Sequence, residues 1–246
     1  MGVVSWLSAI LLKVIMDIYL TPSLGSAIQG SGALASAVAL GVYVGLRTGI
    51  FENGFTFIWA RRTQLWDATF NDAVGFGLGF AGVEALGLGI SSFFNFLVLV
   101  TNPSLLGTLD PATQKALSDQ FALGAALVGP PLIERAMTLF IHVFAVVLVV
   151  MTLKDGKTPF ILAVLYSSVT DGIIPILSLY VSSTTLAGIY LIETPFVFLG
   201  LAGLFGLLRV RDNPAFAVSR PSQGIPHALE ALSPKHPEEH LPELGF

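Results

Sequence analysis

The chain has 246 residues, 54% of them hydrophobic and only 11% charged, with a net charge of −4 and a mean hydropathy of +0.79. A soluble domain usually carries about 25% charged residues, so this chain lacks the polar surface that water requires. The spread of its acidic residues argues against nucleic acid as a partner. The absence of cysteine excludes disulfides and thiolate metal ligands. Because a backbone in lipid must satisfy its own hydrogen bonds, we expect an all-α polytopic bundle in the cell (plasma) membrane.

Six apolar segments are long enough to cross a hydrocarbon core of about 30 Å. The predicted spans are residues 3–20, 31–60, 68–100, 131–153, 158–180 and 184–208. The first span has neither a basic segment before it nor a small-residue cleavage site, so we interpret it as a retained span. Pro175 and Pro195 predict kinks in the fifth and sixth spans.

Basic residues indicate the orientation of the bundle. They follow the even-numbered spans as Arg61, Arg62, Lys154, Lys157, Arg209 and Arg211, whereas the loops on the opposite side carry only Lys115. The positive-inside rule therefore predicts that both termini lie in the cytoplasm.

Two polar segments lie outside the spans. In LDPATQKALSDQF, Asp110 is a candidate N-cap and Pro111 suits the first helical position, which predicts a short extracytoplasmic interfacial helix. The chain from residue 209 onward is rich in proline, charge and histidine and is too polar to pack in the bundle. The predicted domains are therefore a membrane bundle, 1–208, and a cytoplasmic tail, 209–246, that serves as a flexible arm or a docking segment.

Several ionisable residues fall within or at the ends of the spans. Lys13 and Asp17 are four residues apart, so we expect them to neutralise each other on one helix face. A charge at the bilayer centre is expensive, so each of the others should face the bundle interior and a partner. Both a functional role and a structural ion pair remain open for Arg47, Glu52, Glu84, Glu134, Arg135, His142, Asp171 and Glu193.

Glycines 75, 82 and 89 recur every seven residues in the third span, and Gly75 with Gly79 adds a GxxxG pattern. Such a stripe of small residues predicts a face that another helix backbone approaches closely. Glu84 would then point into the bundle interior, and we expect it to meet a cation or a hydrogen-bond donor there, with Arg135 and Arg47 as candidates.

Segments in three regions of the chain together resemble the YhfC-type family of intramembrane proteases, distant relatives of the CAAX-processing and PrsW-type proteases. They are GIFENGFTFIWARR (49–62) followed by GFGLGFAGVEALGLG (75–89), then PPLIERAMTLFIHVFAVVLVV (130–150), and finally LAVLYSSVTDG (162–172). The resemblance implies a site in the membrane where a glutamate activates water and histidines orient it or stabilise the oxyanion. In some relatives the same residues are regarded as metal ligands.

The match to the family pattern is incomplete. Its E-E-x-x-R corresponds to Glu52, Asn53 and Thr56, and its G-H-G-G-x-E corresponds to Gly79, Phe80, Ala81, Gly82 and Glu84. The E-R pair with a later histidine is retained as Glu134, Arg135 and His142, whereas the last histidine is Ser167, before Asp171. The resemblance thus implies the catalytic candidates Glu52, Glu84, Glu134 and His142 and the supporting residues Arg47, Arg135 and Asp171. The substituted family positions are Asn53, Thr56, Phe80 and Ser167.

The helical rise of about 1.5 Å per residue places these positions in one layer near the bilayer middle. Glu52, Phe80, His142 and Ser167 come out roughly 12–18 Å from the cytoplasmic ends of their spans. A catalytic zinc takes three or more protein ligands, so the remaining residues predict neither a metal site nor another cofactor.

Three functional hypotheses follow. In the first, the chain keeps a protease-like fold, has lost the chemistry, and binds a membrane-protein partner or lipid as an accessory subunit. In the second, it is a divergent active intramembrane protease that uses the retained glutamates and His142. In the third, its excess of buried acids over bases serves a small-solute or proton pathway.

Overall fold

The structure is a computed structural model that describes residues 1–63 and 65–216, and this part of the chain folds into helices without strands. Six of its helical segments are long and apolar enough to cross a membrane. They are α1 (Gly2–Tyr19), α3 (Ala33–Arg62), α4 (Phe70–Thr101), α6 (Gly129–Asp155), the pair α7 (Thr158–Gly172) and α8 (Ile174–Tyr180), and α9 (Leu186–Val210). The all-α polytopic bundle and its six spans are thus confirmed, while the orientation of the termini stays a prediction.

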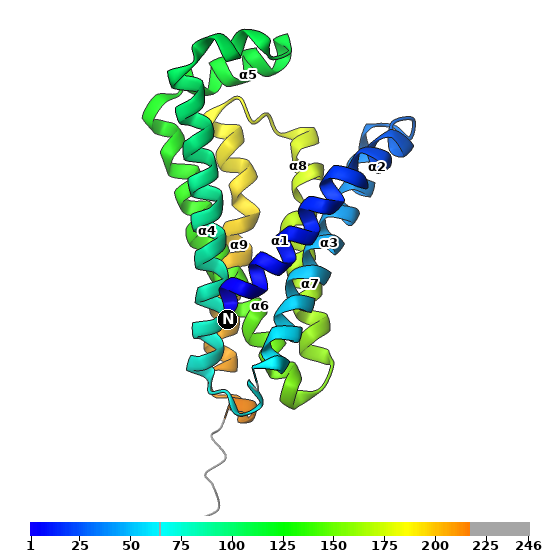
Figure 1. Ribbon diagram of the computed structural model, residues 1–246, viewed down its shortest axis with the longest axis vertical. Coiled ribbons are helices and arrows are strands. Elements are labelled where there is room, and N and C mark those ends of the chain that lie inside the picture. The colour runs from blue at the N-terminus through cyan, green and yellow to red at the C-terminus, as the bar shows by residue number, and fades with distance from the viewer. Residues whose placement is uncertain (64, 217–246) are drawn as a thin grey trace, which may run out of the picture.

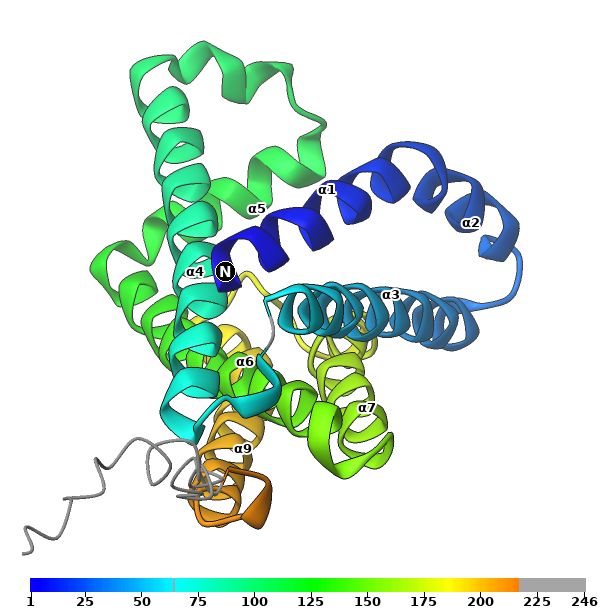
Figure 2. The ribbon, with the colours of Figure 1, turned by 60° about the horizontal axis from the view of Figure 1, so that its bottom comes forward.

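The helices form two groups joined by α6. In Figure 1, α4 and α9 lie on one side, α3, α7 and α8 lie on the other, and α1 crosses obliquely in front. α6 packs against α4, α7 and α9, as the turned view in Figure 2 also shows. The half of α6 from Thr138 to Met151 is mostly buried. This agrees with its sequence, because a helix segment that is surrounded by protein is apolar almost all round.

Short elements connect the spans. They are α2 (Thr21–Ile28), α5 (Pro111–Ala122) and the 3₁₀ turns η1 (Leu65–Asp67), η2 (Pro103–Thr108), η3 (Gly124–Val128) and η4 (Pro214–Phe216). The predicted helix start at Asp110 is confirmed, because its carboxylate accepts the backbone N–H groups of Ala112 at 3.1 Å and Thr113 at 3.0 Å. The sequence interpretation did not include α2.

The structure tests one of the two predicted proline kinks, the one at Pro175. The fifth span breaks at Ile173, and Pro175 lies in the first turn of α8, where a missing N–H costs little. Pro195 lies inside α9, which continues as one helix from Leu186 to Val210.

Close helix packing occurs at a different glycine stripe from the predicted one. A Cβ atom on Gly41, Gly45 or Gly49 would lie 2.3 to 2.4 Å from a backbone carbonyl oxygen or 2.1 Å from a side-chain oxygen of α7, so α3 and α7 touch backbone to backbone. Gly75, Gly82 and Gly89 have no such neighbour within 4 Å among the described residues. The prediction that these three line a helix contact is therefore wrong, whereas a Cβ atom on Gly79 would lie 3.8 Å from the backbone of Gly2 in α1.

One end of the bundle is closely tied together. Lys154, near the end of α6, donates to the carbonyl oxygen of Ala68 at 2.9 Å. The ring of Phe216, in η4, packs edge-on against Phe70 at the start of α4, with 5.7 Å between centroids. The first residues of the predicted tail thus pack on the bundle, and the rest of that tail, 217–246, lies outside the described residues.

Candidate functional site

Glu52 lies at the centre of the bundle and is bound by a lysine from the first span. The Glu52 residue is 3% exposed, and its Oε1 accepts a hydrogen bond from Nζ of Lys13 at 2.6 Å. α1 reaches this position because it packs on both α3 and α4, and Ser5, two turns before Lys13, bonds Thr56 of α3 at 3.0 Å. The spacing of Ser5, Ala9 and Lys13 places all three on the same buried face of α1.

His142 of α6 stands between two carboxylates. Its Nε2 lies 2.8 Å from Oε2 of Glu84 on α4, and its Nδ1 lies 3.6 Å from Oε2 of Glu52 on α3. Neither Oε2 atom has a hydrogen-bond partner among the described residues, so both are close contacts between ionisable groups. The three side chains bring α3, α4 and α6 together at one point.

The substituted family positions surround this cluster and bond to neutral groups. Asn53 donates to Ser167 Oγ at 3.1 Å and to the carbonyl oxygens of Gly49 and Ala163 at 2.8 and 3.3 Å. Phe80 is 1% exposed, and its ring centroid lies 5.3 Å from that of His142. Together with the bond between Thr56 and Ser5, these contacts leave all four substituted side chains buried among protein atoms.

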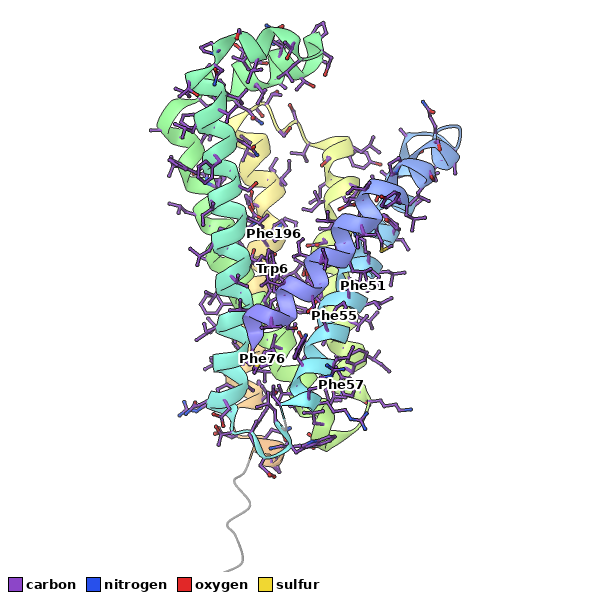
Figure 3. The ribbon with its side chains drawn as sticks, in the orientation of Figure 1. Trp6, Phe51, Phe55, Phe57, Phe76 and Phe196 are labelled. Carbon is purple, nitrogen blue, oxygen red and sulfur yellow. The ribbon has the colours of Figure 1, made fainter. Side chains whose placement is uncertain are left out.

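A cavity of about 270 Å³ adjoins the cluster. Trp6 and Phe196, labelled in Figure 3, are among its apolar lining residues and lie between the two groups of helices. Its polar lining consists of Lys13, Glu84, Glu134, Arg135, Thr138, His142 and Asp171. A larger pocket of about 360 Å³ on the outside of α3 and α7 has no ionisable side chain in its lining, so it offers no acid–base group.

Over the residues that the structure describes, the remaining ionisable candidates do not bond to Glu52 or His142, and only two ion pairs occur among them. Glu134 pairs with its neighbour Arg135, and Arg47 pairs with Asp17. Asp171 accepts the hydroxyl of Thr48 at 2.7 Å. Glu193 is buried on α9 and has one carboxylate oxygen without a hydrogen-bond partner in the described part of the chain.

Two ionisable residues, Lys13 and Glu84, have different partners from those that the sequence predicted. Lys13 bonds Glu52 instead of Asp17, because the lysine side chain points across to α3 while Asp17 meets Arg47. Glu84 does have a partner across a helix interface, as expected, but that partner is His142 instead of Arg135 or Arg47. The role of Lys13 had a signal in the sequence, since it is one of the few basic residues within a span.

Fold and site together define a multi-pass helical membrane protein with a buried cluster of carboxylates and one imidazole. The chain belongs to the YhfC intramembrane metalloprotease family, whose model matches residues 1–195. No curated protein matches the chain, and no solved structure matches it either.

The family description implies a metal ion, and the residues present do not fit one. Within residues 1–63 and 65–216, no three His, Cys, Asp or Glu side chains are grouped so that they could hold one ion. Glu52 and Glu84 approach opposite nitrogens of the same imidazole, so the ring separates the two carboxylates and keeps them from sharing a ligand sphere with it. A catalytic zinc needs three protein ligands around one point.

Proposed function

We propose that this chain is a non-catalytic member of the family that acts as a binding or accessory subunit in the membrane. The observation that carries the proposal is the hydrogen bond from Asn53 to Ser167. The resemblance places a glutamate and a histidine at these two positions, and a neutral amide and a hydroxyl satisfy each other there. Neither group takes up a proton from water at ordinary pH, so neither serves as a general base.

The surroundings of His142 support the same proposal. Phe80 brings an apolar ring against the imidazole at the position where the resemblance expects a second histidine. Catalytic groups that act as a unit lose most of their effect when one member is removed. The presence of Asn53, Phe80 and Ser167 in place of the family's glutamate and two histidines is therefore expected to remove several orders of magnitude of hydrolytic rate.

The test is a proteolysis assay in lipid vesicles with a panel of transmembrane peptides. The wild-type chain and its Glu52→Gln variant should release product at the same background rate. The positive control in the same vesicles is a family member that has a glutamate aligned with Asn53 and histidines aligned with Phe80 and Ser167. Cleavage by the wild type that stops in Glu52→Gln would contradict the proposal.

The accessory role has its own test. Purification of the chain from native membranes in a mild detergent, followed by mass spectrometry, should recover a membrane protein at a fixed ratio to it. Recovery of the chain alone, over a range of detergents, would count against the accessory role.

A divergent protease is the second candidate, and the geometry of one pair favours it. Glu84 and His142 lie 2.8 Å apart, and both line the cavity, so this pair could take a proton from a water molecule there. The same assay separates the two candidates if Glu84→Gln and His142→Gln are added. Activity lost in both variants would favour the protease.

A further inference from the structure

The contact between Lys13 and Glu52 places a cation directly beside a carboxylate of the candidate site. The lysine and glutamate side chains are 11% and 4% exposed, and Nζ lies 2.6 Å from Oε1. Glu84 and Asp171 line the same cavity as Lys13. The lysine thus stands among the carboxylates of three helices, α3, α4 and α7.

Burial makes this charge balance necessary. A carboxylate in a water-poor interior is strongly destabilised unless a positive charge or several donors compensate it. His142 approaches Glu52 only to 3.6 Å, and Oε2 of Glu52 has no hydrogen-bond partner among the described residues. Lys13 therefore supplies the direct compensation of Glu52.

The same contact disfavours a divalent ion. A metal bound to Glu52 would lie close to the Lys13 ammonium, and two cations at that separation repel each other strongly at low dielectric. Lysine is a compact point charge with three donors and no acceptor, so it cannot act as a ligand while protonated.

We propose that Lys13 is the resident cation of this site and that the site takes up no divalent metal ion. The ammonium is tethered to α1 and compensates Glu52 from there. It is fixed in place because α1 is held against α4 at Gly2, where a Cβ atom would lie 2.1 Å from the carbonyl oxygen of Phe76. This inference does not depend on whether the chain cleaves peptides.

The first part of the test measures metal. The purified full-length chain, in lipid nanodiscs, is analysed for bound metal by mass spectrometry and for its unfolding temperature with and without EDTA or added zinc. The expected result is a metal content well below one ion per chain and an unfolding temperature that neither treatment changes. A stoichiometric metal that is lost in Glu52→Gln or His142→Gln would overturn the proposal.

The second part measures the role of the lysine charge. Lys13→Met should lower the unfolding temperature on the order of 10 °C, because it leaves a buried carboxylate without its cation. The double variant Lys13→Met with Glu52→Gln should recover most of that loss, since it removes both charges. Lys115→Met is the matched control, because Lys115 is 75% exposed in a surface pair with Asp119 and should change little.

Each outcome decides the question. If Lys13→Met does not accumulate as folded protein but the double variant does, the lysine is required to balance Glu52 and the proposal is supported. If Lys13→Met is as stable as the wild type, or the double variant is no more stable than Lys13→Met, the proposal fails. No substrate enters these measurements, so a finding of proteolysis would overturn the proposed loss of catalysis and leave this inference unaffected.

Discussion

Nε2 of His142 lies 2.8 Å from Oε2 of Glu84, so the imidazole of α6 and the carboxylate of α4 face each other across a buried helix interface. Their side chains are only 9% and 14% exposed. Removal of either one leaves the other in a water-poor environment without its closest polar neighbour.

A double-mutant cycle measures this coupling. Glu84→Gln and His142→Gln should each lower the free energy of unfolding, and the double variant should lose less than the sum, with a coupling of about 0.5–3 kcal/mol. The measurement is SDS-induced unfolding in mixed micelles, followed by tryptophan fluorescence. The surface pair of Lys115 and Asp119 provides the control cycle, with an expected coupling of about 0.3–0.5 kcal/mol. Additive losses at Glu84 and His142 would show that the two groups do not interact.

The Asn53 amide connects α3 to α7, and its substitutions should follow a fixed order. Asn53→Ala should cost about 1–3 kcal/mol, because it removes the donor to Ser167 and to the carbonyl oxygen of Ala163. Asn53→Asp should cost more, since a buried carboxylate would face the carbonyl oxygens of Gly49 and Ala163, which only accept, and would have the Ser167 hydroxyl as its one donor among these partners. Ser167→Ala should cost least, because the amide keeps its other acceptors. Unfolding temperatures of the purified variants give the order, and an aspartate variant more stable than the alanine variant would contradict it.

The backbone contact between α3 and α7 predicts a difference between two glycines of the same helix. Gly45→Ala should destabilise the bundle by about 1–3 kcal/mol, because its Cβ would lie 2.3 Å from the carbonyl oxygen of Ser168. Gly54→Ala is the matched control, since no non-local atom lies within 4 Å of that Cβ position in the described structure. Equal effects of the two substitutions on unfolding would mean that α3 and α7 are not in close contact.

The cap of α5 predicts a pH dependence. The pKa of Asp110 is lowered by hydrogen bonds from Thr113, through its side chain and then its backbone N–H, with a smaller contribution from the N–H of Ala112. A lowered pKa in the folded state means that the cap stabilises α5 above the unfolded pKa and is lost as the pH falls through the folded value.

Hydrogen exchange of α5, corrected for intrinsic rates, tests this dependence. Protection of the first turn of α5 should be present at neutral pH and fall in the acidic range. Asp110→Ala should remove most of that protection at neutral pH, whereas Asp110→Asn should keep more of it and lose its dependence on pH. Protection in the wild type that is independent of pH would contradict the cap.

The spans and the layer of the site could be predicted, because both depend on quantities that the sequence carries directly. Apolar length sets the six spans, and the fixed rise of a helix sets the depth of each residue along its own span. Glu52, Phe80, His142 and Ser167 all lie in the buried interior, and Glu52 and Phe80 approach His142 as that layer requires.

Partners within the layer could not be predicted in the same way. A pairing depends on how each helix is rotated and where the helices cross, and neither quantity follows from spacing in one chain segment. Lys13 is four residues from Asp17, yet its long side chain reaches Glu52 on a different helix. The glycines show the same difficulty. Glycines 41, 45 and 49 form a stripe along α3, and glycines 75, 82 and 89 form a stripe along α4, but only the stripe on α3 meets another backbone among the described residues.

Buried residues are distributed unevenly along the long axis of the bundle. Those of α4 lie between Ala73 and Ala81, in its first half, and α2, α5 and α8 have none. Lys154 and Phe216 fasten the well-packed end (Figure 1, bottom). The helix halves beyond that end have fewer buried residues, so we expect them to be held less firmly. A bilayer of different thickness should change the tilt of these helix halves first. Such a change in tilt would widen or narrow the cavity that Glu84 and Asp171 line.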